Sequence, residues 1–260
     1  MLIGERHERI IELLVEREAV SVSELSAILD VSPVTIRSDL NQLAEQGKAL
    51  RTHGGARLAG ERARQEYTYT TRQRLNAEQK HQIGQCAARL VQPGEAILLD
   101  ASTTAAAVGQ ALKGRADLTG VTVVTTGIWT ALEMLGAPTI QVVLAGGTLR
   151  TTSGSITGSI TEEVLGRFNF HRAFLGAWGL TLEDGLTDTL LAEVELKRMM
   201  VRCCQELTAV VDSSKFGQTA VASFAGVADV ARIITDPGAP PGMLRRFEKT
   251  GVEVLIADST

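Results

Sequence analysis

The chain has 260 residues, enough for two domains or for one large α/β domain. Apolar residues make up 44% of the sequence and aromatic residues only 4%, so we expect an aliphatic core. The formal net charge is -4. A dedicated polyanion-binding protein is usually basic, so any binding of nucleic acid must use a local patch.

Cysteine usage and hydropathy indicate a cytoplasmic protein. Cys203 and Cys204 are adjacent and Cys86 is distant from both, which fits neither a disulfide framework nor a CxxC metal site. No apolar run approaches the roughly 20 residues that span a bilayer, and the first residues lack a signal-peptide pattern. We therefore expect reduced thiols, no metal, no cofactor and no membrane association.

The N-terminal residues predict three helices. Residues 5–17 place aliphatic side chains on one side and charges on the other. Ser21 and Glu24 have the spacing of a capping box, so a short second helix begins there, and residues 30–31 allow only a tight turn. A third helix is expected from the N-cap Ser32 to about residue 46. Helix, short helix, tight turn and helix is the helix-turn-helix arrangement.

The third helix carries side chains suited to DNA. Its apolar residues recur at spacings of four and three, so one stripe can face a core. The other faces carry donors and acceptors of the kind that read base edges and phosphates in the major groove. These residues are Thr35, Arg37, Ser38, Asn41 and Gln42. On this segment alone, an ordinary amphipathic surface helix is the alternative.

A small hairpin, or wing, is expected after this helix. Gly47 can end the helix, and KALRTHGGARL then predicts two short strands around the Gly54-Gly55 pair. Between residues 31 and 57, four Lys or Arg residues oppose Asp39 and Glu45. The segment therefore carries a small local excess of positive charge where DNA would lie.

From Val31 to Ala56 the sequence resembles the winged helix-turn-helix of the DeoR family of bacterial transcriptional regulators. The resemblance implies DNA contacts from the third helix and the wing. The residues concerned are Ser32, Thr35, Arg37, Ser38, Arg51, His53 and Gly54. Many members carry an arginine at position 38, so Ser38 puts phosphate binding and operator preference in question. For His53 a structural role in the turn is the alternative. We expect Asp39 to cap or orient Arg37, because phosphates repel a carboxylate.

A linker is expected at residues 59–77, between a DNA-binding domain at 1–58 and a second domain at 78–260. The stretch 58–80 loses apolar periodicity and contains five Lys or Arg residues against three Glu. A solvated linker is the simple interpretation. The alternative is that its arginines contact DNA phosphates or a neighbouring subunit.

From residue 78 onward, short aliphatic strands alternate with helices. Strands are expected at 96–100, 121–125, 140–144, 173–177, 208–212, 231–236 and 252–257. Helices are expected at 78–91, 103–112, 127–135, 157–167, 189–205 and 242–250. This alternation predicts a parallel sheet covered on both faces, so the fold class is α/β with an N-terminal winged helix-turn-helix. Ligands bind such sheets at the carboxyl ends of the strands.

Glycines and small polar residues follow five of the predicted strands. Asp100 ends the first strand, and the hydroxyl residues 102–104 precede a helix, as at sites that bind phosphate. Plain N-capping by Ser102 or Thr103 is the alternative. Glu195 and Lys197 lie two residues apart, so both cannot share one face of a regular helix. We expect most charges of helix 189–205 to be solvated.

Residues 78–257 resemble the DeoR-type sensor domain, which is similar in fold to ribose-5-phosphate isomerase. The motifs LLDASTT, VVTTG, LAGGTLR, DGLTD, AEVELKRMM and VDSSKFG occur in the family's order. The resemblance implies a pocket for a phosphorylated sugar or polyol. Its residues would be Asp100, Ser102, Thr103, Thr104, Thr126, Gly127, Gly146, Gly147, Asp184, Thr187, Glu195, Lys197 and Lys215. Ala105 and Thr126 replace a hydroxyl and an asparagine common in the family, which leaves the sugar open.

These features predict a DNA-binding transcriptional regulator, usually a repressor in this family, of a carbohydrate-metabolism operon. Its expected partners are double-stranded operator DNA, a phosphorylated sugar effector and further copies of itself in a dimer or tetramer. The alternative is a sugar-phosphate isomerase-like enzyme with an attached DNA-binding head, in which Asp184, Glu195 and Lys197 would supply acid–base chemistry. We expect no enzyme, because a DNA-binding head is unusual on a metabolic enzyme.

Overall fold

The computed structural model describes residues 2–17, 19–58 and 69–258. The chain divides into two compact units, Met1–Leu75 and Asn76–Thr260. Each unit has its own hydrophobic core. Among the described residues, none of the helices is long and apolar enough to cross a membrane.

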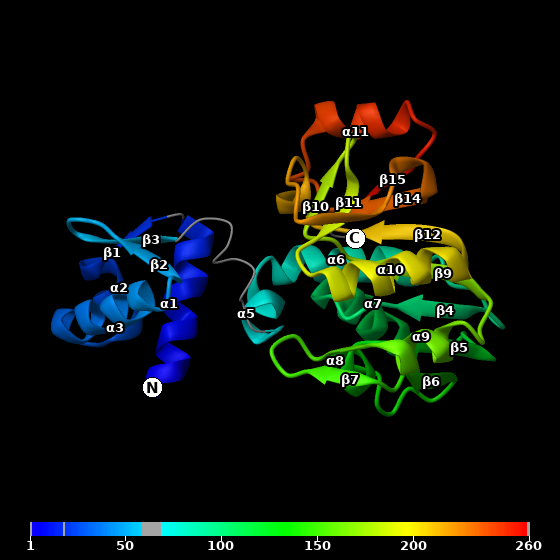
Figure 1. The fold of residues 1–260 in the computed structure, drawn as a ribbon, viewed down its shortest axis with the longest axis horizontal. Coiled ribbons are helices and arrows are strands. Elements are labelled where there is room, and N and C mark those ends of the chain that lie inside the picture. The colour runs from blue at the N-terminus through cyan, green and yellow to red at the C-terminus, as the bar shows by residue number, and fades with distance from the viewer. Residues whose placement is uncertain (1, 18, 59–68, 259–260) are drawn as a thin grey trace. The chain divides into compact units, whose positions relative to one another are not determined.

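The first unit is a helix-turn-helix with a three-stranded sheet (Figure 1). Its helices are α1 (Ile3–Arg17), α2 (Val22–Leu29), α3 (Pro33–Glu45) and α5 (Tyr69–Arg74). Its strands are β1 (Ala19–Ser21), β2 (Ala49–Arg51) and β3 (Gly55–Leu58). The predicted three helices and hairpin are thereby confirmed. The core is aliphatic, with Leu14, Leu25, Ile36, Leu40 and Leu43 all fully buried.

Local side-chain chemistry fixes where α2 and α3 begin. Ser21 and Glu24 form the capping box, in which each side chain bonds the other residue's backbone N–H. Ser32 accepts a hydrogen bond from the backbone N–H of Thr35, and Pro33 occupies the first turn. Asp30 ends α2 in a left-handed conformation with φ of 53°. These caps set the tight turn between the two helices.

Strand β1 is an element that the sequence did not predict. It pairs antiparallel with β3, so that the strand order is β1-β3-β2. At Gly55 the two backbones come so close that a Cβ atom there would lie 2.1 Å from the carbonyl oxygen of Val20. A glycine is therefore required at the start of β3, whereas a Cβ at Gly54 would meet nothing within 4 Å.

Substituting Gly55 by alanine should destabilise the first unit by about 1–3 kcal/mol, because the added methyl group must displace backbone atoms. Gly54→Ala is the matched control and should leave stability nearly unchanged. Hydrogen exchange of the amides in residues 19–58 of the full chain would measure both variants. Equal exchange in the two variants would contradict the close approach of β1 and β3.

The predicted linker is partly helical. Residues 59–68 lie outside the described residues, but residues 69–74 form α5. Arg74 at the end of α5 pairs with the buried Glu12 of α1 at 3.2 Å, and Leu75 contacts the core of the first unit. The boundary between the two units falls after Leu75, within the stretch predicted as a linker.

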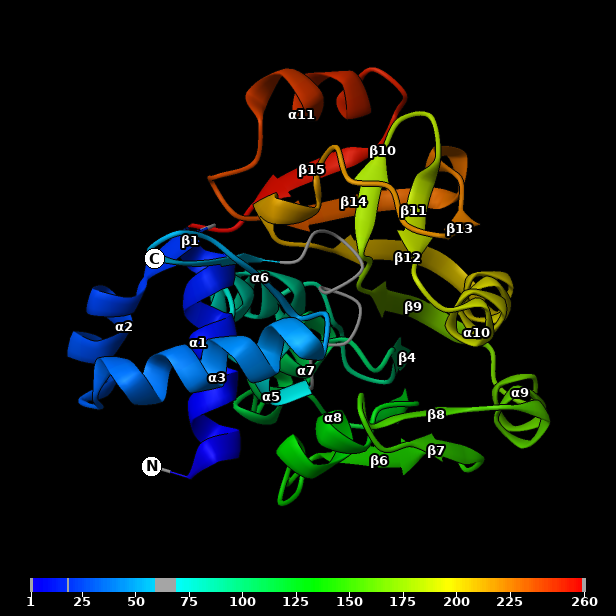
Figure 2. The same ribbon diagram turned by 60° about the vertical axis from the view of Figure 1, so that its left-hand side comes forward.

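The second unit is built on a seven-stranded parallel sheet in the order β15-β14-β12-β9-β4-β5-β6 (Figures 1 and 2). The strands are β4 (Ala96–Leu99), β5 (Val121–Thr125), β6 (Ile140–Leu144), β9 (Phe170–Leu175), β12 (Cys204–Val210), β14 (Val230–Thr235) and β15 (Glu253–Ile256). All seven overlap strands predicted from the sequence.

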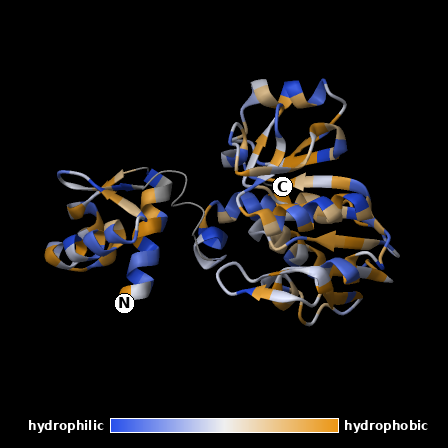
Figure 3. Cartoon of the chain, in the orientation of Figure 1, coloured by the Kyte–Doolittle hydropathy of each residue, from blue (hydrophilic) through white to orange (hydrophobic). Residues whose placement is uncertain are grey.

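Helices cover both faces of this sheet. They are α6 (Ala77–Ala88), α7 (Thr103–Lys113), α8 (Ile128–Glu133), α9 (Ser159–Leu165), α10 (Leu191–Cys203) and α11 (Pro241–Glu248). Ile97 and Leu99 of β4 contact the core beneath α6 and α7, whereas Leu98 contacts the core that includes residues of α9, α10 and α11. Both faces of the strands are therefore apolar. Figure 3 shows much of the sheet in orange, the colour of hydrophobic residues.

Two smaller sheets complete the second unit, and neither was predicted. One consists of β10 (Gly179–Thr181), β11 (Gly185–Asp188) and β13 (Ala222–Ala225). The other is the hairpin of β7 (Thr148–Arg150) and β8 (Ser155–Thr157). These strands have only three or four residues and lack the aliphatic runs of the large sheet, so neither alternation nor hydrophobicity marks them in the sequence.

Candidate functional site

The outward face of α3 carries the predicted DNA-contacting residues of the helix. Arg37 and Ser38 are exposed, as the assignment requires. Ser32 and Thr35 are engaged with each other: Ser32 Oγ accepts from the Thr35 amide at 3.1 Å and lies 2.9 Å from Thr35 Oγ1. These two hydroxyls hold the start of the helix and retain only part of their capacity for another partner.

The wing presents its tip to solvent. His53 and Gly54 are exposed in the turn between β2 and β3. Arg51 is exposed as well, and its Nη1 donates to the carbonyl oxygen of Gly55 at 2.9 Å. Arg51 therefore braces the turn, with the rest of its guanidinium at the surface.

Asp39 does not orient Arg37, contrary to the prediction. It is 2% exposed and accepts two hydrogen bonds from Arg6, at 2.6 and 3.0 Å, while His7 Nε2 lies 3.1 Å from its Oδ1. Burial tends to raise the pKa of Asp39, but the bonds from Arg6 and His7 outweigh it and hold that pKa below its ordinary value. Asp39 thus joins α3 to α1.

Asp39→Asn should lower the free energy of unfolding of the first unit at pH 7 by about 3 kcal/mol, because Arg6 loses its buried partner. Because the pKa of Asp39 is lowered on folding, its contribution is full above the ordinary value of 3.8 and disappears as the pH falls through the folded value. Urea unfolding from pH 7 to pH 2 should show the two proteins converging in acid. The exposed Glu45→Gln is the control, and parallel pH profiles for wild type and Asp39→Asn would contradict the pairing.

The order of strands in the large sheet defines one crevice. From β4 the chain continues to β5 and β6 on one side, and then returns to β9 on the other side. The topological switch point therefore lies between β4 and β9. In parallel α/β sheets, ligands bind outside the carboxyl ends of the strands at this point.

Asp100 ties the ends of β4 and β9 together. Its Oδ1 accepts from the amide and the hydroxyl of Ser102, at 3.1 and 2.6 Å, and its Oδ2 accepts from the amide of Gly176 at 3.1 Å. A Cβ at Gly176 would lie 2.4 Å from Ser102 Oγ, so the two strand ends meet through a glycine. Ser102 also accepts from the amide of Ala105 and so is the N-cap of α7, as the alternative interpretation expected.

Lys197 of α10 is the buried cation at this crevice. Its Nζ lies 3.0 Å from Asp100 Oδ2 and 2.7 Å from Asp188 Oδ2, and it donates to the carbonyl oxygen of Gly176 at 2.9 Å. The ring of Phe224 has its centroid 5.0 Å away. Burial tends to lower the pKa of Lys197, but the two carboxylates outweigh it and raise that pKa, so the ammonium stays charged.

Glu195 was predicted at the site together with Lys197, but it does not belong to this buried group. Its side chain is 61% exposed and pairs with Arg198 at 2.7 Å. Glu193 lies one turn before Lys197 and is buried instead; it accepts from Ser155 Oγ and from Arg150 Nη1, the latter at 3.1 Å. The expectation that most charges of this helix are solvated holds for Glu195 and Arg198 but not for Glu193 and Lys197, which are buried. The spacing of four residues between Glu193 and Lys197 was a signal in the sequence for one shared face.

A second group of charged residues lies at the end of β12. Asp212 is buried and accepts from Asn76 Nδ2 at 3.0 Å and from both the amide and the hydroxyl of Ser214. Burial tends to raise its pKa, but the charge of Lys215 and the bonds from Ser214 lower it, and the buried Lys80 adds to this effect. Lys215 is half-buried, with its Nζ 5.4 Å from the ring centroid of Trp178, two residues beyond Gly176.

Several predicted site residues have structural partners. Asp184 is exposed in the turn between β10 and β11, where it accepts from Thr219 Oγ1 at 2.9 Å. Thr187 Oγ1 donates to the carbonyl oxygen of Gly179 at 3.2 Å and accepts from the amide of Ala220 at 2.9 Å. The three groups of the isomerase alternative, Asp184, Glu195 and Lys197, therefore form no shared hydrogen bond or ion pair among the residues that the structure describes.

The remaining predicted residues lie at the carboxyl ends of β4, β5 and β6. Thr103 and Thr104 are buried in the first turn of α7. Thr126 and Gly127 follow β5, and Gly146 and Gly147 follow β6. A Cβ at Gly147 would lie 2.2 Å from Thr161 Oγ1, and Gly146 accepts from that hydroxyl at 2.8 Å, so this loop holds the start of α9.

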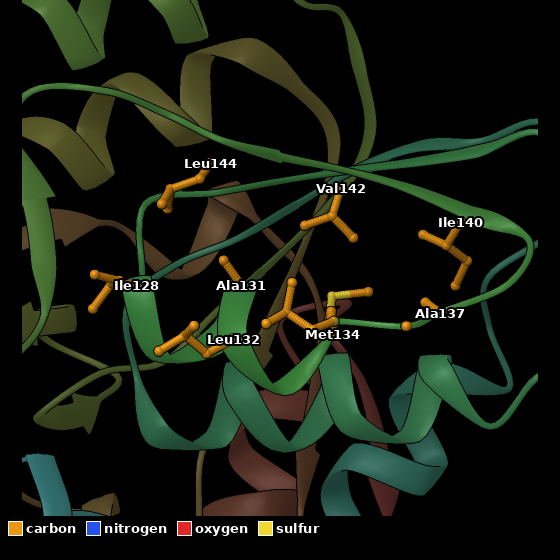
Figure 4. A pocket seen from close by; sticks show the side chains of 10 residues that line it. Ile128, Ala131, Leu132, Met134, Ala137, Ile140, Val142 and Leu144 are labelled. Atoms are coloured by element: carbon orange, nitrogen blue, oxygen red, sulfur yellow. The ribbon is translucent and has the colours of Figure 1, made fainter.

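An apolar groove of about 430 Å³ lies elsewhere, between α8 and the edge strand β6 (Figure 4). Its lining residues are Ile128, Ala131, Leu132, Met134, Leu135, Gly136, Ala137, Ile140, Val142 and Leu144. None of them carries a charge, so this groove is chemically unsuited to a phosphate. The predicted site residues lie outside its lining.

Comparison with known proteins decides the family. The DeoR-like helix-turn-helix domain matches residues 6–62, and the DeoR C terminal sensor domain matches residues 75–237. The chain belongs to the DeoR family. Among curated DeoR relatives, the HTH-type transcriptional regulator GolR of Listeria innocua is 37% identical over 98% of both chains. The glycerol-3-phosphate regulon repressor of Escherichia coli K12 is 34% identical over 91% of both. The putative aga operon transcriptional repressor of Escherichia coli O157:H7 is 33% identical over 97% of this chain and 93% of its own.

This DeoR-family chain is therefore a DNA-binding transcriptional regulator and not an enzyme. Solved structures with partial similarity include ribose 5-phosphate isomerase A of Methanocaldococcus jannaschii, with a TM-score of 0.41 and 21% identity over 54% of this chain and 55% of that chain. The full-length sorbitol operon regulator SorC of Klebsiella pneumoniae has a TM-score of 0.37 and 12% identity over 80% of this chain and 88% of that chain. Both likenesses are distant, so the assignment depends on the family models and the curated relatives.

Proposed function

We propose that this DeoR-family regulator represses a carbohydrate-metabolism operon in the cytoplasm and releases its operator when a phosphorylated sugar or polyol binds the second unit. The names of two relatives, the aga operon and glycerol-3-phosphate regulon repressors, support the class of operon and of effector. The sign of control follows from the same names, since both proteins are repressors.

The observation that carries the effector proposal is the group of buried charged side chains at the switch point between β4 and β9. This group consists of Asp100, Asp188 and Lys197. The carboxylates can accept hydrogen bonds from sugar hydroxyls, and the ammonium group can donate to them. Two half-buried cations, Arg150 and Lys215, lie on segments that border this group and can pair with a phosphate. Further proposed contacts come from residues 102–104, 126–127 and 146–147 at neighbouring strand ends.

For the operator, we propose contacts from α3 and the wing of a homo-oligomer. The contacting residues would be Ser32, Thr35, Arg37, Ser38, Arg51, His53 and Gly54. A helix-turn-helix protein generally reads two half-sites about one helical turn apart, which requires paired heads. The loss of DNA affinity on induction equals the preference of the effector for the DNA-free state, so a hundredfold loss needs about 2.7 kcal/mol of differential binding.

Arg37→Ala should weaken operator binding by about 1–3 kcal/mol if Arg37 forms a bidentate base contact. Fluorescence anisotropy with a labelled operator duplex would measure the loss. Arg89→Ala removes an exposed arginine of the second unit and is the control. Unchanged operator affinity in the Arg37 variant would contradict the proposed role.

Lys215→Gln should abolish stabilisation by the effector and leave DNA binding intact. A thermal-shift screen of phosphorylated sugars and polyols, each beside its unphosphorylated form, would identify the effector, because a ligand at about 100 times its Kd stabilises the folded state by roughly 2.7 kcal/mol. The exposed Lys249→Gln is the matched control. If Lys215→Gln still responds at the wild-type concentration, the phosphate binds elsewhere; if no phosphorylated compound stabilises the wild type, the effector class is wrong.

A further inference from the structure

Val34, the second residue of α3, is the apolar side chain of the helix that the fold leaves unused. It is 72% exposed, whereas Ile36, Leu40 and Leu43 of the same helix are fully buried. A β-branched residue also slightly disfavours a helix, so its presence at this surface position brings no local gain. The described residues of the first unit, 2–17, 19–58 and 69–75, therefore provide no structural reason for valine at position 34.

The position of Val34 on the helix explains why an apolar residue is useful there. Residues at spacings of three, four and seven lie on one face of a helix, and from Val34 these are Arg37, Ser38 and Asn41. All four are exposed, and they lie opposite the buried stripe that starts at Ile36. Val34 is thus the N-terminal member of the outward face of α3. In helix-turn-helix proteins the N-terminal residues of the second helix contact the base edges.

The chemistry of the side chain selects its partner. A valine side chain can neither donate nor accept a hydrogen bond, and the 5-methyl group of thymine is the apolar feature of the major-groove edge. Contact between the two removes apolar surface from water. Valine keeps one χ1 rotamer in most helices, so it loses little conformational freedom on contact. The hydroxyls of Ser32 and Thr35 on the same turn already bond each other.

We propose that Val34 reads a thymine 5-methyl group in each half-site of the operator and makes that thymine part of the recognised sequence; this inference rests on the operator contacts proposed above for α3. Arg37 and Ser38, one turn further along the helix, then face the adjacent base pairs. This role is distinct from phosphate contacts, which fix the position of the protein on DNA without reading sequence.

The test uses the full-length protein and a duplex selected by it from a random pool. Each thymine of the selected half-sites is replaced in turn by deoxyuridine, which removes only the methyl group. We expect one position per half-site at which this replacement weakens wild-type binding about three- to fourfold, the effect of one buried methyl group. Val34→Ala should weaken binding to the thymine duplex and should bind the thymine and deoxyuridine duplexes equally at that position.

The matched control is Val221→Ala, which truncates a 61% exposed valine of the second unit and should retain the wild-type discrimination. Val34→Ala should fold normally, because alanine is the better helix former, and circular dichroism would verify this. Three results would overturn the proposal: no invariant thymine in the selected half-sites, no deoxyuridine position that weakens wild-type binding, or a Val34→Ala protein that still discriminates at that position.

Discussion

The buried ion pairs of Lys197 hold the second unit together around its crevice. One ammonium group joins three segments, since Asp100 follows β4, Asp188 ends β11 and Lys197 itself lies on α10. With both carboxylates ionised the group has a net charge of minus one, so it repels a phosphate. The sugar part of an effector can bond there, whereas its phosphate needs cations outside the group. This constraint is why Lys215 and Arg150, rather than Lys197, are the cations we assign to the phosphate.

The contacts of α10 provide a route by which effector binding can change the arrangement of the second unit. Glu193 and Lys197 lie one turn apart on α10, and they contact different segments: Glu193 contacts Arg150 and Ser155, whereas Lys197 pairs with Asp100. A ligand that competes for either set of contacts acts on the same helix. Coupling of this kind needs an element with two arrangements that the ligand and the DNA favour differently, and α10 is the candidate in the second unit.

Features whose causes lie within a few residues of the chain could be predicted from the sequence, whereas features that depend on contacts between distant residues could not. Caps at Ser21 and Ser32 and the seven aliphatic strands could be read directly, because their causes lie within a few residues. Asp39 lies within the buried stripe of α3, but its partners Arg6 and His7 are 33 and 32 residues away in the chain, and no spacing rule could pair them. The sequence predicted that the loops at the strand ends would converge. It could not predict the order of the strands, and therefore not the switch point, because strand order depends on tertiary structure.

The polar groups of the crevice are already paired with one another, which favours a role in sensing a ligand over a role in catalysis. General acids and bases must be free to exchange a proton with the substrate, with pKa values near the working pH. Lys197 has its pKa raised by two carboxylates, and Asp100 accepts hydrogen bonds from Ser102 and Gly176 and forms an ion pair with Lys197. A ligand that enters must exchange its own hydrogen bonds for these. Such an exchange contributes little to chemistry, but it makes the free energy of binding depend on the arrangement of α10 and the strand ends, which is what control of a separate DNA-binding unit requires.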